Sequence, residues 1–280
     1  MQNVTPFLWL NNQAEEAATL YTSLFPDSKI EFASRQYVTY ELAGQKFMAL
    51  NGGPMFTMTP SVSFFVYCET VEEIDRIWEK LSQGGKVMME LQQYPFSEKY
   101  GWLNDKYGVS WQLMVGEAEH KVTPFLFFTG KQNGKAEEAV NYYVSVFNNS
   151  SIGTITYYQP GMGEPEKAVV HADFVLAGQP FMAMENSGPH AFTFSEANSF
   201  FIGVETQAEV DELWEKLSQG GSKGQCGWLK DKYGLSWQVI PKKLSELLAG
   251  ESEKAGKVYK AMLTMTKLDI AQLQEAYDQD

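Results

Sequence analysis

A twelve-residue segment occurs twice in this chain of 280 residues. It reads Gly-Trp-Leu-Asn-Asp-Lys-Tyr-Gly-Val-Ser-Trp-Gln over residues 101–112, and ten of its twelve positions are unchanged over residues 227–238. Asp first and Gly fourth in Asp-Lys-Tyr-Gly suit a type I turn, because the Asp side chain caps turn amides and Gly is favoured at the fourth position. Each copy therefore predicts a β-hairpin, and the chain carries the same structural unit twice.

The strand after the turn alternates in polarity. Val109, Trp111 and Leu113 form a wholly apolar face, whereas Ser110 and Gln112 lie on a mixed face. The apolar face is expected to pack on helices. The mixed face is left for another partner, and the identity of that partner is the functional question.

The duplication extends beyond this hairpin. Four further pairs of segments match between the halves: 5–10 with 123–128, 14–17 with 136–139, 43–49 with 177–183, and 77–85 with 213–221. A period of about 120 residues is too long for a solenoid and indicates tandem domains.

Each half is expected to contain two βαβββ modules. In the first module the pattern predicts a strand over 5–10, a helix over 14–25, and strands over 30–35, 37–42 and 46–50. A strand over 61–67 and a helix over 71–83 begin the second module in the same way.

These elements predict an α+β chain of three parts. The first domain spans 1–118, the second spans 119–241, and a helical tail packed on the second domain spans 242–280. The linker is short and charged, so the domains are expected to pack together rather than swing freely. The matching apolar helix stripes of the two repeats predict an internal pseudo-dimer. Whether the chain is a monomer or a homodimer is left open.

Composition narrows the classes of partner. A net charge of -13 and a pI near 4.8 disfavour nucleic acid and anionic membranes as partners. No apolar run approaches the ~20 residues that span a bilayer. No secretory signal is visible at the N-terminus, and Cys68 and Cys226 lie far apart, which favours a cytoplasmic protein with reduced thiols.

The paired modules, the Ala-Glu-Glu-Ala helix starts, the Ala-Gly-Gln-x-Phe-Met-Ala segments and the repeated hairpin closely resemble the PhnB-like branch of the vicinal oxygen chelate superfamily. That superfamily includes glyoxalase I, bleomycin and fosfomycin resistance proteins and extradiol dioxygenases. This branch often carries the label 3-demethylubiquinone-9 3-methyltransferase. The resemblance covers nearly all of residues 4–240 and implies two tandem glyoxalase-like domains. The fold hosts enzymes and binding proteins alike.

The resemblance also implies where a metal would be held. Metal enzymes of the superfamily use four strand positions, which fall here near Pro6, Asn51, Ser61 and Gln112, and near Pro124, Glu185, Ala197 and Gln238. A divalent metal needs several convergent N or O donors, and these positions include one carboxylate and no imidazole. We therefore expect neither a catalytic metal nor a cofactor.

The methyltransferase label finds no support in the residues. Many S-adenosylmethionine enzymes use a Gly-rich turn between a strand and a helix. The nearest segment here, residues 161–165, is expected between two strands, and Pro165 stands where a helix would have to begin.

Candidate catalytic residues gather in the second half. His171 and Asp173 are two apart on a predicted strand, so they share one face. They suit a base and its orienting carboxylate, or else a solvated sheet face. Glu185 adds a second carboxylate. The equivalent residues of the first half are Tyr37, Thr39 and Asn51, so the second half is expected to hold the more reactive pocket.

Ligand-binding candidates come from both halves. Gln112 and Gln238 would contact a ligand or each other across a domain seam, and Trp102 and Trp228 would roof a pocket. The full set adds Tyr37 and Asn51, with Leu126 and Phe128 as the apolar floor of the cavity. The long segment 87–100 would cover one cavity or plug the other.

These residues favour a protein that binds a small, largely apolar or aromatic ligand without a metal. Two alternatives stay open: an enzyme acting on a small quinone-like or aromatic substrate, including a metal-dependent enzyme of the glyoxalase or dioxygenase type, and an enzyme fold kept as an interaction scaffold.

Overall fold

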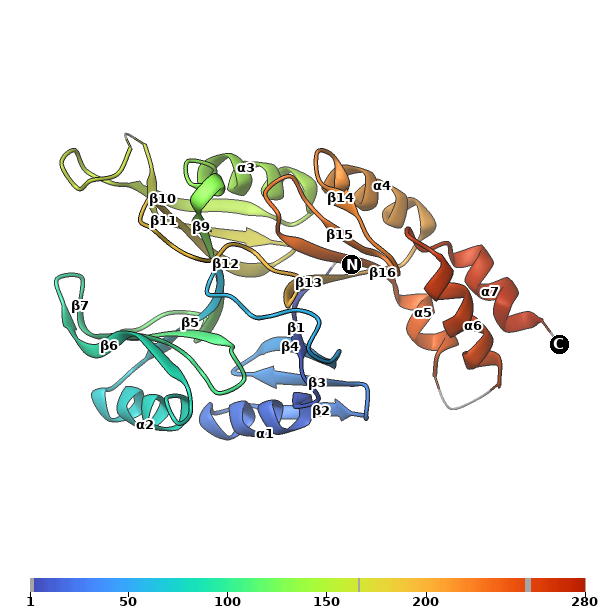
Figure 1. The fold of residues 1–280 in the computed structure, drawn as a ribbon, viewed down its shortest axis with the longest axis horizontal. Helices are drawn as coiled ribbons and strands as arrows, with labels where there is room; N and C mark the ends of the chain where they lie inside the picture. Colours follow the sequence, from blue (N-terminus) through green and yellow to red (C-terminus); the bar gives the residue numbers. More distant parts are fainter. Residues whose placement is uncertain (1–2, 166, 250–252, 280) are drawn as a thin grey trace.

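The computed structural model describes residues 3–165, 167–249 and 253–279. In these residues, four βαβββ modules follow one another and three helices come after them (Figure 1). Module 1 contains β1 (Asn3–Leu10), α1 (Ala14–Leu24), β2 (Lys29–Ala33), β3 (Tyr37–Leu42) and β4 (Gln45–Asn51). Module 2 contains β5 (Val62–Cys68), α2 (Val71–Leu81), β6 (Lys86–Tyr94), β7 (Ser97–Asn104) and β8 (Ser110–Val115).

The second repeat has the same order of elements. Module 3 contains β9 (Val122–Thr129), a 3-10 turn (Gly130–Gln132), α3 (Ala136–Val146), β10 (Ser151–Tyr157), β11 (Val169–Leu176) and β12 (Gln179–Asn186). Module 4 contains β13 (Asn198–Val204), α4 (Gln207–Ser218), β14 (Ser222–Lys223), β15 (Trp228–Lys230) and β16 (Ser236–Pro241). The α+β class and the module pattern are as predicted from the sequence.

The strands form two sheets, and each sheet joins the two repeats. Sheet A has the order β14-β15-β16-β13-β1-β4-β3-β2, so it combines modules 4 and 1. Sheet B has the order β10-β11-β12-β9-β5-β8-β7-β6 and combines modules 3 and 2. The modules meet through antiparallel pairs, β1 with β13 and β5 with β9. No sheet therefore belongs to one repeat.

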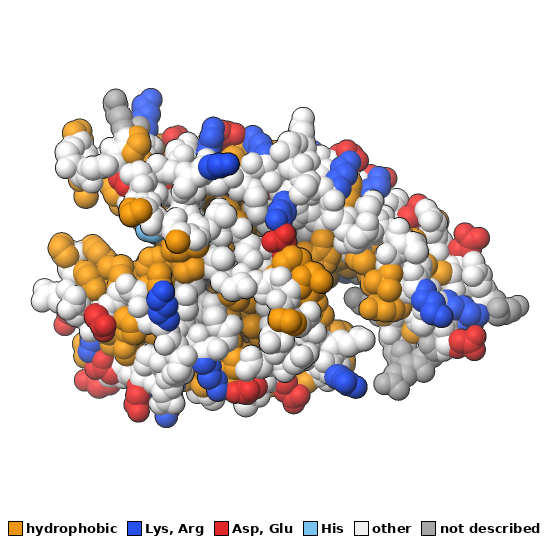
Figure 2. Space-filling view, viewed as in Figure 1, with side chains coloured by type: hydrophobic (Ala, Val, Ile, Leu, Met, Phe, Trp, Pro, Cys, Tyr) orange, Lys and Arg blue, Asp and Glu red, His pale blue; other side chains and the backbone are white. Residues whose placement is uncertain are grey.

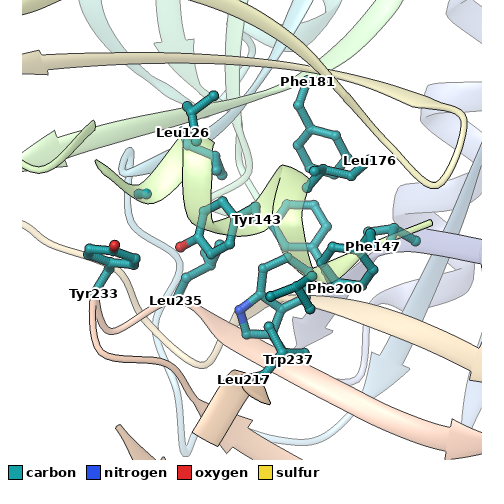
Figure 3. Close-up of a cluster of buried hydrophobic side chains, with 14 of the residues drawn as sticks. Leu126, Tyr143, Phe147, Leu176, Phe181, Phe200, Leu217, Tyr233, Leu235 and Trp237 are labelled. Carbon is teal, nitrogen blue, oxygen red and sulfur yellow. The ribbon is translucent and has the colours of Figure 1, made fainter. Parts of the chain in front are cut away.

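The hydrophobic cores, in contrast, follow the repeats. Helices α1 and α2 lie side by side over one half, and α3 and α4 lie over the other (Figure 1). Tyr21, Phe64 and Trp111 are buried in the first core. Tyr143 and Trp237 are buried in the second, which Figure 3 shows. Each sheet is thus shared between the repeats, whereas each helix-packed core is formed mainly by one repeat. The division of the chain into domains that end at residues 118 and 241 stays a prediction.

The repeated hairpin contains a buried carboxylate. Asp105 Oδ1 accepts from the backbone N–H groups of Tyr107 (2.8 Å) and Val109 (3.0 Å), as expected for the turn. Its Oδ2 accepts from Tyr21 Oη (2.7 Å) and Trp111 Nε1 (2.9 Å), which ties the hairpin to α1. Much of the duplicated motif is therefore there for folding.

The C-terminal helices α5 (Lys242–Leu247), α6 (Glu253–Thr264) and α7 (Ile270–Asp278) pack on module 4. The Asp269 side chain caps α7, and Val258 and Met265 are buried in a small core of their own. A backbone hydrogen bond from Cys226 to Met265 (2.7 Å) joins these helices to the loop before β15. Among the helices that the structure describes, none is long and apolar enough to cross a membrane.

The face of each sheet turned away from the helices is a concave surface lined by both repeats. We call these surfaces cup A, on sheet A, and cup B, on sheet B. In cup B, Phe65 and Tyr100 of the first repeat pack with Phe125, Phe127 and Met182 of the second. Figure 2 shows a cleft between the β6–β7 hairpin and the β10–β11 region, where cup B opens.

Candidate functional site

Cup B is lined by aromatic and methionine side chains. Its buried members are Phe65, Tyr100, Phe125, Phe127 and Met182, and Tyr67, Met89, Tyr94, Trp102, Met114, Met184 and Phe192 pack against them partly buried. Aromatic and thioether groups favour flat apolar molecules, and methionine adapts to irregular shapes.

His171 and Asp173 lie in this cup. Ala172 and Phe174, which alternate with them on β11, are buried in the helix-packed core, so the two polar side chains face the other way. His171 Nε2 lies 2.9 Å from Asp173 Oδ1, and their side chains are 36% and 47% exposed. A carboxylate only accepts, so Nε2 donates to it, and in the neutral imidazole Nδ1 is then left as an acceptor.

A pocket of about 260 Å³ adjoins this pair. Tyr67, Thr123, Asp173 and Met182 line it together with the linker around His120. Burial raises the pKa of Tyr67, and the negative charge of Asp173 raises it further, so the phenol stays protonated at neutral pH. The pocket thus presents a phenol, the carboxylates of Asp173 and Glu119 and the imidazole of His120 beside an apolar wall.

The polar residues of β8 are bonded within cup B. Tyr100 Oη donates to Gln112 Oε1 (2.7 Å), and Gln112 Nε2 donates to Ser63 Oγ (2.7 Å). Trp102 Nε1 donates to Ser110 Oγ (2.8 Å). Gln112 is therefore not bonded to Gln238 across the two repeats, as one of the predictions had it. Its hydrogen-bond partners lie in module 2.

A loop between β12 and β13 adds residues that the sequence did not single out for this site. His190 packs against Phe127, with ring centroids 4.9 Å apart. Its Nε2 lies 2.8 Å from Asn186 Oδ1, and Asn186 Nδ2 donates to Glu164 Oε1 (2.7 Å). Burial lowers the pKa of His190, so its imidazole is mostly neutral at pH 7. The loop has no periodic pattern. The sequence Gly-Pro-His shortly after β12 is therefore the only signal that could have pointed to His190.

Glu185 lies on the opposite face of sheet B, which corrects its grouping with His171. Its Oε1 accepts from the backbone N–H of Val169 (2.7 Å), and its Oε2 accepts from that of Ala136 (3.2 Å), the first residue of α3. Asn51 accepts in the same way from Ala14 at the start of α1 (2.9 Å). Each of these buried or half-buried side chains satisfies a free amide at a helix start.

Leu126 and Phe128 also lie on the helix side, so the predicted apolar floor is wrong at both residues. Both are fully buried in the second core, where Figure 3 shows Leu126 among the side chains clustered with Tyr143. The floor of the cup is formed by Phe125 and Phe127, their neighbours in sequence.

Cup A contains the remaining candidates. The Trp228 ring contacts Phe7 (5.7 Å between centroids) and Trp9 (6.1 Å), both of module 1. Gln238 Nε2 donates to Ser199 Oγ (3.0 Å). Tyr37 lies on β3, at the open side of the cup, and is 36% exposed. Trp102 occupies the equivalent place in cup B, where it contacts Phe127 (5.9 Å).

The donor sets in the cups do not fit a divalent metal. Within residues 3–165, 167–249 and 253–279, no three His, Cys, Asp or Glu side chains lie close enough to hold an ion. Glu185, the carboxylate at a metal-ligand position of the superfamily, is turned toward α3 and already accepts from two amides. A metal site requires several convergent donors, which this arrangement does not supply.

Paired βαβββ modules that build concave eight-stranded sheets define the vicinal oxygen chelate class of proteins. The chain belongs to the 3-demethylubiquinone-9 3-methyltransferase family, whose model matches residues 2–114 and again residues 120–240. The double match covers both repeats.

Two solved structures are similar to parts of this chain. A PhnB protein of Bacillus cereus, described as a putative 3-demethylubiquinone-9 3-methyltransferase, is 46% identical, covering 41% of this chain and 99% of its own with a TM-score of 0.40. A glyoxalase I variant from Zea mays is 12% identical, covering 86% of this chain and 94% of its own with a TM-score of 0.56, which shows the shared fold. The comparison with curated proteins found no match.

Proposed function

We propose that the protein binds a small apolar or aromatic molecule in cup B, without a catalytic metal. One observation carries this proposal: the half-exposed His171–Asp173 pair lies on the same sheet face as a buried aromatic cluster, beside a pocket of about 260 Å³. An apolar pocket with a few polar groups is the usual form of a small-molecule site.

The polar pair defines one property of the ligand. Asp173 accepts a hydrogen bond from His171 Nε2, which leaves Nδ1 of the neutral imidazole to accept a hydrogen bond from the bound molecule. A ligand with one O–H or N–H on an apolar body fits this arrangement. The same geometry favours a second candidate, an enzyme acting on a small aromatic or quinone-like substrate, because a carboxylate-oriented imidazole can remove a proton.

The family description does not extend to methyl transfer in this proposal. Residues 161–165 belong to the loop that connects β10 with β11, so they do not form a Gly-rich turn from a strand into a helix.

The cysteines Cys68 and Cys226 are both free thiols, which supports a cytoplasmic location.

We also propose that the chain works as an internal pseudo-dimer. Each sheet combines one module from each repeat, so a single chain supplies both halves of both cups. Such an arrangement needs no second copy to complete a site.

N-phenyl-1-naphthylamine provides a direct test, because it is apolar, carries one N–H and fluoresces when it leaves water. His171→Ala should weaken its binding by roughly 1–3 kcal/mol through loss of the acceptor. Tyr37→Ala, at the matched position of cup A, should have less effect. Met182→Lys should abolish binding in cup B by placing a charge in its wall. Met48→Lys makes the matched change on β4, in cup A, and serves as the control.

Circular dichroism of each variant checks that the fold is retained. Loss of probe binding in Met48→Lys together with full binding in Met182→Lys and His171→Ala would contradict the proposal for cup B.

A further inference from the structure

Tyr100 and Cys226, which each precede the Gly-Trp-Leu of the repeated motif, are one of the pairs of equivalent residues at which the two cups differ. In cup B, the Tyr100 hydroxyl donates to Gln112 Oε1, and its ring packs near Phe65. Cys226 brings neither a ring nor a hydroxyl to cup A. Among the residues that the structure describes, none donates a hydrogen bond to Gln238 Oε1.

A second difference lies close by in the same motif. In cup B the Trp102 indole N–H is bonded to Ser110 Oγ. In cup A the Trp228 ring turns edge-on toward Phe7, at an interplanar angle of 90°. Ser236 Oγ, the equivalent of Ser110 Oγ, is buried and has no hydrogen-bond partner in the described part of the chain.

These unpaired groups lie on one face of sheet A, the face that forms cup A. Ser236 and Gln238 are two apart on β16, while Trp237 between them is buried in the helix-packed core, so both polar side chains point into cup A. Trp228 lies directly opposite Gln238 on β15. A buried hydroxyl without a partner costs free energy, and a bound molecule that supplies the partner recovers it.

We propose that cup A is a second binding site, for a phenol or a similarly hydroxylated aromatic molecule. The hydroxyl of the ligand would donate to Gln238 Oε1, as Tyr100 donates to Gln112 in cup B. It would accept from Ser236 Oγ or from the Trp228 indole, because a phenol oxygen both donates and accepts. The ring would lie beside Phe7 and Trp228, where aromatic contacts are favourable.

The charges at this site agree with a neutral ligand. Lys230, two residues after Trp228 on β15, is paired with Glu196 (2.5 Å), so it offers no free cation to an acid. On the side of the C-terminal helices, Figure 2 shows a notch bordered by apolar side chains. Met265 and Phe201 belong to the apolar cluster on this side.

The test uses 4-methylphenol, the side chain of tyrosine, and follows ¹³C-labelled methionine methyl groups by NMR. Met265 reports on cup A, and Met182 reports on cup B. We expect 4-methylphenol to shift Met265 saturably. Toluene, which lacks the hydroxyl, should bind there about tenfold more weakly, the effect of about one hydrogen bond.

Matched variants separate the two cups. Gln238→Leu and Ser236→Ala should each weaken the response of Met265 by about tenfold, whereas Gln112→Leu and Ser110→Ala should leave it unchanged. Ser236→Ala removes only an unpartnered hydroxyl, so it keeps the test decisive if Gln238→Leu fails to fold.

Equal affinity for 4-methylphenol and toluene at Met265 would overturn the proposal. Wild-type affinity in Ser236→Ala and in folded Gln238→Leu would do so as well, and so would shifts confined to Met182. The last result would leave the proposal for cup B standing, because the two inferences rest on different sheets and different reporters.

Discussion

The phenol of Tyr143 on α3 donates a hydrogen bond of 2.8 Å to the buried carboxylate of Asp231 in the second hairpin. Trp237 Nε1 donates to the same oxygen (2.8 Å), and two turn amides donate to the other. Tyr21 and Asp105 repeat the contact in the first half (2.7 Å). In each repeat, one carboxylate thus joins a helix, a turn and a strand.

Removing one donor from this carboxylate should destabilise the fold. We expect Tyr143→Phe to lower the free energy of unfolding by about 1.5–3 kcal/mol, because a hydrogen bond to a buried charge is lost. Tyr21→Phe should cost a similar amount in the first repeat. Urea unfolding followed by circular dichroism measures both, and the exposed Tyr259→Phe serves as the control. Equal stability of all three variants would show that these phenols do not stabilise the carboxylates.

The same carboxylate gives stability a defined pH dependence. Burial raises the pKa of Asp231 from 3.8 to about 6, which means that the folded chain holds this proton more tightly than the unfolded chain. The free energy of unfolding should therefore fall as pH rises from about 4 to about 6, by roughly 3 kcal/mol at most from this residue.

Asp231→Asn cannot titrate, so its difference in unfolding free energy from the wild type isolates this contribution. The wild type should lose stability relative to Asp231→Asn between about pH 4 and about pH 7. A difference that is constant with pH, or that grows in favour of the wild type, would contradict the raised pKa.

The position of Glu185 predicts a structural rather than a catalytic effect. Glu185→Gln should destabilise the protein by about 1–3 kcal/mol, because an amide N–H₂ replaces one of two acceptors that face buried N–H donors. Binding of N-phenyl-1-naphthylamine in cup B should stay at the wild-type level, since Glu185 lies on the other face of the sheet. Fluorescence titration of the folded variant checks this, and weakened binding at unchanged stability would return Glu185 to the site.

Chelation should leave the protein unchanged. A bound structural metal adds its binding free energy directly to folding, and the described residues of the cups supply no convergent donor set to hold one. Thermal melts with and without EDTA should therefore superimpose. A lower midpoint after chelation, restored by one divalent ion, would show that a site is present.

Periodicity predicted the helices and hairpins because each buries one face. The stripe in residues 14–25 became α1, and the alternation after Gly108 placed Trp111 in the core and Gln112 in the cup. The same reasoning failed at Leu126 and Phe128. Every residue of β9 is buried, so its sequence carries no sign of which face meets the helices.

Long-range pairing was also invisible in the sequence. The contact of β1 with β13 joins residues about 200 positions apart, and no local pattern encodes it. His190 reaches Phe127 from a loop whose shape depends on Asn186 and Glu164, so its place beside the aromatic cluster could not be derived from spacing. The share of each cup contributed by each repeat followed only from the three-dimensional structure.

The two equivalent serines of β8 and β16 should respond in opposite ways to the same substitution. Ser110→Ala leaves the part-buried Trp102 N–H without its acceptor, so it should lower the free energy of unfolding by about 1–3 kcal/mol. Ser236→Ala removes a buried hydroxyl that has no partner among the described residues, so it should be neutral or stabilising. Each serine is followed by Trp and Gln, Trp111–Gln112 in one repeat and Trp237–Gln238 in the other, so each variant is the control for the other. Urea unfolding of both variants at neutral pH measures the difference. If Ser236→Ala costs as much as Ser110→Ala, the Ser236 hydroxyl has a partner in solution and the difference between the cups is smaller than the structure indicates.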